Sequence, residues 1–164
     1  MDITIAAMQP DDWLAVEQIY LDGIADGNAT FEMESPGWEK WNADHHPHAR
    51  LVAKEHGAVV AWAALSPVSG RQVYRGVAEV SIYVAESARG KGIGRRLLAE
   101  LIRSSEQNEV WTLQAGIFPE NLASIALHKA CGFREVGVRE RIGQLGARWR
   151  NTVLLERRSP IVGV

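Results

Sequence analysis

The sequence predicts a mixed α/β fold in which helices flank a seven-stranded, mostly antiparallel sheet that contains one parallel pair of strands. Apolar residues repeat with periods typical of a strand, helices, three strands, a helix, a strand, a helix and two strands, in that order. A strand, a helix and a second strand follow one another over residues 77–117, and such a unit pairs its strands in parallel. A chain of 164 residues is expected to form a single domain, residues 1–164.

The N-terminal part is expected to hold one strand and two helices. Ile3 and Ile5 alternate with small or polar residues, which is typical of a strand. Apolar residues at helical spacing after a Pro-Asp-Asp turn predict a helix over residues 11–22. Residues 23–36 are rich in Gly, Asn, Ser and Pro and predict a long loop, which is a kind of segment that often carries function. A second helix is expected to start after Pro36.

The rest of the chain predicts six strands and two helices. Apolar runs bounded by turn residues indicate the strands, and apolar residues with a period near 3.6 indicate the helices. The expected strands are 51–53, 59–65, 77–84, 110–117, 133–141 and 148–155, and the expected helices are 92–107 and 121–130. The first two of these strands form a hairpin, and the last two form a closing antiparallel pair.

Composition excludes several classes of protein. Hydrophobic residues make up 46% of the chain and charged residues 23%, which is typical of a folded globular protein. A net charge of -2 offers no basic excess for binding nucleic acid. The single cysteine, Cys131, excludes a disulfide within the chain. No apolar run approaches the ~20 residues of a membrane helix, and the first residues lack the basic region of a secretory signal, so a cytoplasmic location without membrane contact is expected.

The most informative segment is a glycine-rich turn that follows a strand and opens a helix at residues 89–96, with the sequence Arg-Gly-Lys-Gly-Ile-Gly-Arg-Arg. Glycines let the backbone approach a ligand closely. The first amides of a helix have no partners within it, and with the helix dipole and the basic side chains they predict a site for a pyrophosphate. The glycine spacing fits neither a P-loop nor a dinucleotide-binding turn. A turn with solvated charges is the alternative.

Two motifs resemble the GNAT N-acetyltransferases. Arg89-x-x-Gly92-x-Gly94, after the strand Ser81-Ile82-Tyr83-Val84, resembles the coenzyme A signature of that superfamily, and Asn121-x-x-Ser124-x-x-x-His128-x-x-x-Gly132-Phe133 resembles its second signature. The order of elements matches over nearly the whole chain. Three further pieces resemble the phosphinothricin acetyltransferase branch, which includes enzymes acting on methionine sulfoximine: Asn28-Ala29-Thr30-Phe31, residues 79–84, and Gly146-Ala147-Arg148-Trp149.

The resemblance implies a GNAT fold with acetyl-CoA as co-substrate. The pyrophosphate is expected at Arg89, Gly90, Lys91, Gly92, Ile93, Gly94 and Arg95. The pantetheine arm is expected on the backbone of Ile82, Tyr83 and Val84, much as a strand adds to a sheet edge, and Asn121 and Ser124 are also expected at the coenzyme. The two parallel strands must then splay apart and leave a slot between about Val84 and Ala115. A plain N-cap is the alternative role for Asn121.

Glu79 is the candidate catalytic base. Alternation along the strand places it on one face with Val77, Ser81 and Tyr83. A carboxylate within so apolar a strand is costly unless it has water, a partner or a raised pKa. A salt bridge to an arginine or an exposed strand face is the alternative. The resemblance places Glu79 on the catalytic glutamate of the family, where it takes the proton of the amine through a water.

His128 is the second candidate catalytic residue. It shares one helix face with Asn121 and Ser124, because the three follow at i, i+3 and i+7. A lone helix histidine is more often a surface or capped residue. The resemblance implies a role as proton shuttle or as a partner for Glu79, and a backbone N–H near Tyr83 or Val84 as oxyanion donor.

The resemblance also implies an acceptor pocket. Arg75 is expected to bind the carboxylate of an amino-acid acceptor, since a guanidinium suits a carboxylate, and Phe31 is expected to form a lid. Trp149 is expected to reach the acceptor site or a partner subunit. Alternatively, Arg75 is a solvated loop arginine, Phe31 packs within its loop, and Trp149 belongs to the core. Relatives often carry Lys and Asp where this chain has Leu145 and Asn151, which bears on the polar acceptor and not on the coenzyme.

We therefore expect an acetyl-CoA-dependent N-acetyltransferase that acts on the α-amine of a small L-amino acid or analogue, such as phosphinothricin, methionine sulfoximine or methionine sulfone, by direct transfer in a ternary complex. The resemblance to the family also suggests a homodimer. The alternatives are transfer to another amine, such as a polyamine or a protein N-terminus, and a non-catalytic acyl-CoA sensor. No metal is expected, because the histidines of residues 45–48 fit no common zinc spacing. Cys131 is expected to be a small buried residue and not a nucleophile.

Overall fold

The computed structural model describes residues 2–164, and its centre is one seven-stranded sheet with the order β1-β2-β3-β4-β5-β7-β6. All neighbouring strands are antiparallel except β4 and β5, which are parallel. The strands are β1 (Ile3–Ala7), β2 (Leu51–Glu55), β3 (Ala58–Pro67), β4 (Val77–Val84), β5 (Thr112–Ile117), β6 (Arg134–Leu145) and β7 (Arg148–Arg158). The helices are α1 (Trp13–Asp26), α2 (Trp38–Asp44), α3 (Ile93–Gln107) and α4 (Leu122–Ala130). The predicted fold class is confirmed.

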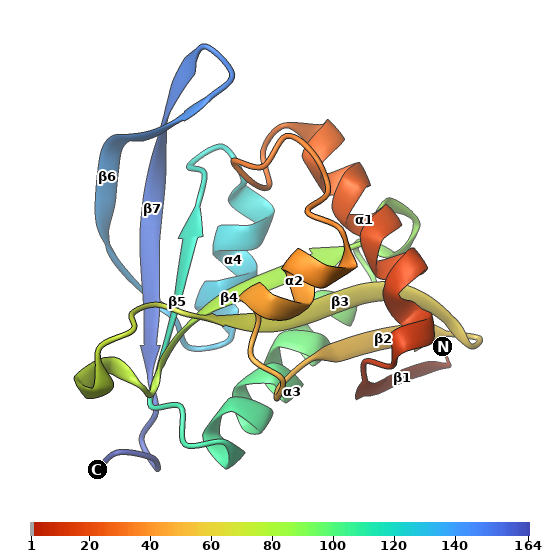
Figure 1. Ribbon diagram of the computed structural model, residues 1–164, viewed down its shortest axis with the longest axis horizontal. Coiled ribbons are helices and arrows are strands. Elements are labelled where there is room, and N and C mark those ends of the chain that lie inside the picture. Colours follow the sequence, from red (N-terminus) through yellow and green to blue (C-terminus); the bar gives the residue numbers. More distant parts are fainter. Residues whose placement is uncertain (1) are drawn as a thin grey trace.

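Helices cover both faces of the sheet, with α1 and α2 on one side and α3 and α4 on the other (Figure 1). Strand β3 shows how the sequence produces this, because its successive side chains point to opposite faces. Trp62 and Ala64 pack with α1 and α2, whereas Ala61, Ala63 and Leu65 pack with α3. Strand β4 alternates in the same way, as expected from its sequence. Within residues 2–164, no helix combines the length and apolarity that a bilayer crossing requires.

Helix α3 is amphipathic, and its apolar stripe is fully covered. Leu97, Leu98 and Leu101 are 0% exposed, as expected for side chains spaced by three and four residues on the sheet-facing side. Gly94 allows α4 to pack closely, since a Cβ atom there would lie 3.3 Å from the side chain of Leu127. The helix begins after Gly92, which is the N-cap in a left-handed conformation (φ 76°).

Helix α1 is longer than predicted and continues to Asp26. The sequence suggested a break at Gly23, but this glycine lies inside the helix. A Cβ atom at Gly23 would come within 2.8 Å of the Tyr83 ring, so the glycine permits close packing of α1 on β4. The helix ends at Gly27, which adopts φ 81°. The loop after α1 is therefore shorter than expected and starts at Gly27.

Strand β6 also continues beyond its expected end, to Leu145, and forms a long hairpin with β7 that projects from the sheet (Figure 1). The register shifts between Arg139 and Gly143, which marks a bulge. Arg141 adopts φ 46° within the bulge, and its backbone N–H donates to Oδ1 of Asn151 (2.7 Å). Asn151, one of the departures from the relatives, thus stabilises the bulge.

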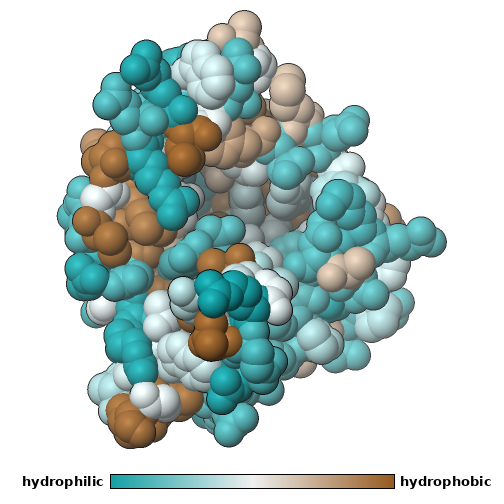
Figure 2. All heavy atoms as spheres, turned by 60° about the vertical axis from the view of Figure 1, so that its left-hand side comes forward, coloured by the Kyte–Doolittle hydropathy of each residue, from teal (hydrophilic) through white to brown (hydrophobic). Residues whose placement is uncertain are grey.

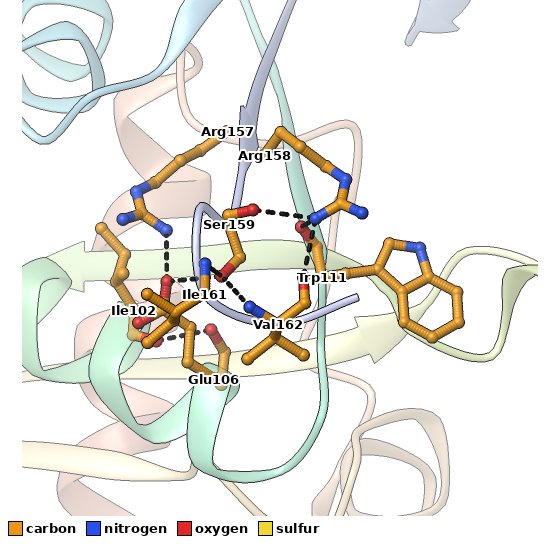
Figure 3. A network of polar contacts seen from close by, with 9 residues as sticks. Ile102, Glu106, Trp111, Arg157, Arg158, Ser159, Ile161 and Val162 are labelled. Carbon is orange, nitrogen blue, oxygen red and sulfur yellow. Dashed lines mark hydrogen bonds and ion pairs between the residues drawn. The ribbon is translucent and has the colours of Figure 1, made fainter. Parts of the chain in front are cut away.

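The C-terminal residues close against the start of β5 (Figure 3). The Arg158 guanidinium donates to the carbonyls of Val162 (2.8 Å) and Gly163 (2.6 Å). Ser159 donates through its hydroxyl to Glu106 of α3 (2.9 Å) and through its backbone N–H to the carbonyl of Trp111 (2.8 Å). These bonds hold the end of β7 and the start of β5 together, beside the parallel pair.

Replacement of Leu101 by alanine tests the packing of α3. The side chain is 0% exposed, so we expect Leu101→Ala to lower the free energy of unfolding by about 2–5 kcal/mol. Leu14→Ala is the matched control, because Leu14 is 77% exposed and should change the free energy by no more than about 0.5 kcal/mol. Urea unfolding followed by circular dichroism measures both, and equal losses would contradict the arrangement.

Candidate active site

The parallel pair separates part of the way along its length. Strands β4 and β5 pair at only three positions, the last of which is Glu79 opposite Gln114. Strand β4 continues to pair with β3 as far as Val84, and β5 continues to pair with β7 as far as Ile117. The backbone edges that face each other beyond Glu79 therefore lack a strand partner. This is the splayed slot that the resemblance to the GNAT enzymes implied between about Val84 and Ala115.

A cavity of about 380 Å³ occupies this slot. Its walls come from β4, β5, the loop after α1, the start of α4, and the β6–β7 hairpin. Figure 2 looks toward the side that carries β6 and β7 and shows a hollow in that face. Of the residues predicted for the site, the lining includes Phe31, Glu79, Ile82, Tyr83, Asn121, Ser124 and His128. The fold thus brings both candidate catalytic residues to one cavity.

Glu79 is half-buried at the point where the parallel ladder ends. Nε2 of Gln114, its cross-strand partner, donates to Oε1 of Glu79 (3.4 Å). Among residues 2–164, no arginine, lysine or histidine forms an ion pair with this carboxylate. The salt bridge considered from the sequence is therefore not found in this part of the chain. The second carboxylate oxygen is available to a group in the cavity.

His128 is almost fully buried, with 2% of its surface exposed. Its Nδ1 lies 2.7 Å from the Ser124 carbonyl oxygen, so Nδ1 carries the proton and donates. Nε2 is buried and has no hydrogen-bond partner within the described residues. Burial lowers the pKa of His128 below its usual value, so the imidazole is neutral near pH 7. The neutral ring thus keeps an unshared Nε2 lone pair in a residue that lines the cavity.

Tyr83 forms a rigid apolar part of the wall. Its ring stacks on Trp62 (centroids 4.9 Å apart) and packs against Tyr20 (5.2 Å). Burial raises the pKa of Tyr83, so its phenol is neutral. The aromatic cluster under β4 fixes the position of this strand beside the cavity.

The turn before α3 has the backbone geometry expected of an anion site. Gly90 and Gly92 adopt φ values of 75° and 76°, and no atom lies within 4 Å of a Cβ built on either. The Arg96 N–H donates to the Gly92 carbonyl (3.2 Å) as the first bond of the helix. The amides of Ile93, Gly94 and Arg95 therefore have no partner within α3.

The basic side chains of this turn differ in their availability. The Arg89 Nε donates to the Val84 carbonyl (3.2 Å), and Lys91 forms an ion pair with Glu55 (3.3 Å). Arg96 turns away and donates to the Ile3 carbonyl (3.2 Å). Arg95 is exposed. Arg89, Lys91 and Arg95 thus lie at the turn, as predicted, although Lys91 is paired with Glu55. Arg96, which the sequence analysis also counted among the basic side chains of the turn, binds the carbonyl of Ile3 instead.

Asn121 has the capping role that was the alternative reading. Its Oδ1 accepts from the Ser124 N–H (3.2 Å), which caps α4. Its Nδ2 donates to the Asn28 carbonyl (3.1 Å) in the loop after α1. Both polar ends of Asn121 thus bind protein groups, while the residue still lines the cavity.

Phe31 lies in the cavity wall between the loop and the hairpin. Its ring meets Phe118 edge to face (centroids 4.9 Å apart). A Cβ atom at Gly143 of β6 would lie 2.8 Å from the same ring. Glycine at this position therefore allows Phe31 to close against the hairpin, which places the expected lid residue at the cavity.

Two expected acceptor residues lie away from the cavity lining. The Arg75 guanidinium packs over the Trp111 ring (5.2 Å to the centroid) and donates to the Gln72 carbonyl (3.3 Å). Trp149 is 56% exposed on the hairpin, which excludes the core position considered for it. Neither side chain lines the cavity of this chain. An acceptor bound in this cavity would therefore not be expected to contact Arg75 or Trp149 of the same chain.

Arg150 is an important residue that the sequence analysis missed. It is 4% exposed, and its guanidinium donates to the Gly27 carbonyl (3.0 Å) and to Asn28 Oδ1 (2.8 Å). It also pairs with Glu120 (3.2 Å) and lies over the Phe118 ring (3.9 Å). Arg150 thus holds the loop that carries Phe31 against the sheet. The available signal was a basic residue just before the apolar run of the last strand.

The features discounted from the sequence have ordinary structural surroundings. His45 stacks on Trp41 (4.3 Å), and His46 stacks on His48 (4.7 Å). Within residues 2–164, no three His, Cys, Asp or Glu side chains gather in a way suited to hold a metal ion. Cys131 is half-buried, and burial raises the pKa of its thiol, which disfavours the thiolate needed for nucleophilic attack.

An interrupted parallel ladder beside a helix whose first amides lack helical partners is the arrangement that the resemblance led us to expect, that of an acyltransferase using an extended thioester coenzyme. Comparison with known proteins agrees with this assignment. The profile of the Acetyltransferase (GNAT) family matches residues 12–133, and the chain belongs to this family.

Individual relatives show the closer similarities. The chain is 34% identical to phosphinothricin N-acetyltransferase of Alcaligenes faecalis, with 94% of this chain and 81% of the relative covered. A phosphinothricin acetyltransferase from Sinorhizobium meliloti, solved with AcCoA, is 30% identical with a TM-score of 0.88 over 99% of this chain and 91% of that one. A ribosomal-protein-alanine N-acetyltransferase from Brucella melitensis is 36% identical with a TM-score of 0.87 over 95% and 99% of the two chains.

Replacement of Arg150 by methionine tests its hold on the loop. The change leaves the Gly27 carbonyl without its donor and Glu120 without its ion-pair partner, so we expect a loss of about 1–3 kcal/mol in stability. Hydrogen exchange should accelerate in residues 27–32. Arg148→Met, at an exposed position of the same strand, is the control and should leave exchange in the loop unchanged. Unaltered exchange in Arg150→Met would contradict the proposed hold.

The buried His128 makes stability depend on pH. Its pKa in the folded protein is lowered from 6.5, so the unfolded chain binds a proton first as the pH falls. The stability contributed by the neutral ring is therefore present above about pH 6.5 and is lost below it. We expect wild type to lose more stability than His128→Gln between about pH 7.5 and about pH 5.5 in urea unfolding. His45, His46 and His48, whose pKa values are also lowered, contribute equally to both proteins, so equal losses would contradict this expectation.

Proposed function

We propose that this enzyme transfers the acetyl group of acetyl-CoA to the α-amine of a small L-amino acid or analogue of the phosphinothricin and methionine sulfoximine type. The observation that carries the proposal is the meeting of Glu79 and a neutral His128 in a cavity formed where the parallel pair separates. Binding of a coenzyme alone needs neither residue. The similarity to a phosphinothricin N-acetyltransferase over 94% of this chain supports the choice of acceptor class.

The residues of the chain fit acetyl-CoA as co-substrate. The free amides of Ile93, Gly94 and Arg95, with the positive-φ glycines before them, suit its pyrophosphate. The edge of β4 from Ile82 to Val84 lacks a strand partner on the side of β5 and suits the amides of its pantetheine arm, although the Val84 carbonyl already accepts from Arg89. The coenzyme supplies an acetyl group activated as a thioester. A coenzyme bound in the slot would place the carbonyl carbon of its acetyl group near Glu79, where the acceptor amine loses its proton.

Glu79 acts as the general base in this proposal. An alkyl amine is mostly protonated at neutral pH and must lose a proton before it can attack. The carboxylate takes this proton, directly or through a water, while Gln114 holds one of its oxygens in place. The new N–C bond forms as the C–S bond breaks, in a ternary complex. A backbone N–H near Tyr83 or Val84 stabilises the charge on the carbonyl oxygen.

His128 completes the proton movements. Its Nδ1 proton is committed to the Ser124 carbonyl, so Nε2 is the atom that can exchange a proton in the cavity. A neutral ring can receive a proton by way of Glu79 or water and return it to the departing thiolate. The same lone pair can instead orient a water for Glu79. Both roles require the neutral form that burial favours.

The acceptor binds between Phe31 and the catalytic pair. Phe31 covers the side chain of the acceptor, and its position against Phe118 and Gly143 limits the size of that side chain. Arg75 as carboxylate ligand and Trp149 as a contact of the acceptor or of a partner subunit stay predictions. We also propose a homodimer in the cytoplasm. The exposed Trp149 on a projecting hairpin is suited to a subunit contact.

Transfer to a protein N-terminus is the second candidate function. It is favoured by the 36% identity to the ribosomal-protein-alanine N-acetyltransferase from Brucella melitensis. An acceptor screen distinguishes the two, with acetyl-CoA and release of free thiol as the readout. Turnover with phosphinothricin, methionine sulfoximine or methionine sulfone supports the first proposal, and turnover confined to alanine-starting peptides supports the second. Coenzyme binding without acceptor-dependent release would contradict both.

Replacement of Glu79 by glutamine tests the general base. The amide cannot accept the proton of the amine, so we expect the rate of acetyl transfer to fall by about 10²-fold or more. Acetyl-CoA binding, measured by calorimetry, should change little. Glu86→Gln, which removes an exposed carboxylate just after β4, should leave both quantities as in wild type. An unchanged rate in Glu79→Gln would exclude this base.

A further inference from the structure

Arg139 faces the cavity because of its register in the hairpin. It lies opposite Thr152 of β7, and cross-strand partners carry their side chains on the same face. Both residues line the cavity. The flanking residues Val138 and Glu140 line a separate depression, as the alternation of a strand requires. The Arg139 side chain thus lies on the cavity face of the hairpin, just before the bulge of β6, where it is also exposed to solvent.

The charge of Arg139 is not neutralised by another side chain of the described chain. Of the other six arginines of this hairpin, Arg134, Arg141, Arg150 and Arg157 each form an ion pair with a carboxylate, whereas Arg148 and Arg158 form none within residues 2–164. Over residues 2–164, Arg139 forms none. Its guanidinium is therefore available to an anionic group that enters the cavity.

The cavity lining offers an anionic ligand few basic side chains other than Arg139. Among the lining residues that the structure describes, Arg139 is the one basic side chain, whereas Glu32 and Glu79 are acidic. His128 is neutral, since burial lowers its pKa. The expected carboxylate ligand, Arg75, lies on Trp111 outside the lining. A carboxylate placed in the cavity meets a single side-chain cation.

We propose that Arg139 binds the α-carboxylate of the acceptor. This inference rests on the proposed function and deepens it. The α-amine faces the carboxylate of Glu79 on β4, and the α-carboxylate faces the guanidinium of Arg139 on β6, so the two charges of an amino acid meet opposite charges from two walls. A planar guanidinium can hold a carboxylate through two parallel hydrogen bonds. Arg139 thereby selects amino acids over simple amines.

The test compares two acceptors in two variants. The acceptors are L-methionine sulfone and its α-carboxamide, which lacks the negative charge. A charge-assisted pair is lost in Arg139→Gln, so we expect the KM for methionine sulfone to rise about 10- to 100-fold, while the KM for acetyl-CoA is unchanged. The KM for the carboxamide should be the same in wild type and variant. Arg139→Lys should recover part of the loss, because it restores the charge without the bidentate geometry.

Arg141→Gln is the matched control. Arg141 lies two residues away, is exposed and lines the other depression, so its replacement should leave both KM values as in wild type. Equal KM values for methionine sulfone in wild type and Arg139→Gln would overturn the inference and leave the proposed function intact. A selective rise in Arg75→Gln and not in Arg139→Gln would assign the carboxylate to Arg75 instead. If wild type acetylated neither methionine sulfone, methionine sulfoximine nor phosphinothricin, the proposed function would fail and the inference with it.

Discussion

The missing backbone hydrogen bonds between β4 and β5 are the constraint on which the site depends. Pairing stops at Glu79 and Gln114, although both strands continue and each is held by its other neighbour. Buried backbone donors and acceptors are costly when unpaired, so the separated edges are suited to a ligand that can replace a strand. Strand β4 is held by β3, and strand β5 is held by β7, on either side of the slot.

The walls of the slot are held from several directions. The aromatic cluster of Tyr20, Trp62 and Tyr83 fixes β4 from one side. Arg150 fixes the loop after α1 to the sheet by binding its carbonyl and amide groups. A buried arginine is tolerated here because its donors are satisfied and its charge is paired with Glu120. The loop side of the cavity thus depends on polar contacts, whereas the turn before α3 depends on backbone geometry.

Most of the fold could be predicted from the sequence, because the periodicity of apolar residues indicated each of the seven strands and the four α-helices that flank the sheet. Local rules failed where a residue acts through a distant contact. Gly23 suggested the end of a helix, but it permits the packing of Tyr83. The sequence motifs pointed to Glu79 and His128 as site residues, and the fold places both in the lining of one cavity. Arg139 and Arg150 were not singled out, because position on the cavity face and burial depend on strand register and on a bulge that alternation alone does not reveal.

Gly143 contacts Phe31 from behind the cavity wall. In the proposed function Phe31 touches the acceptor, and Gly143 controls how much room the Phe31 ring has. Gly143 does not line the cavity, yet a side chain there would have to displace the Phe31 ring. Divergence among related enzymes in the bulk of the amino acids they accept can therefore arise from substitutions on a strand remote from the reaction, with the catalytic groups left intact.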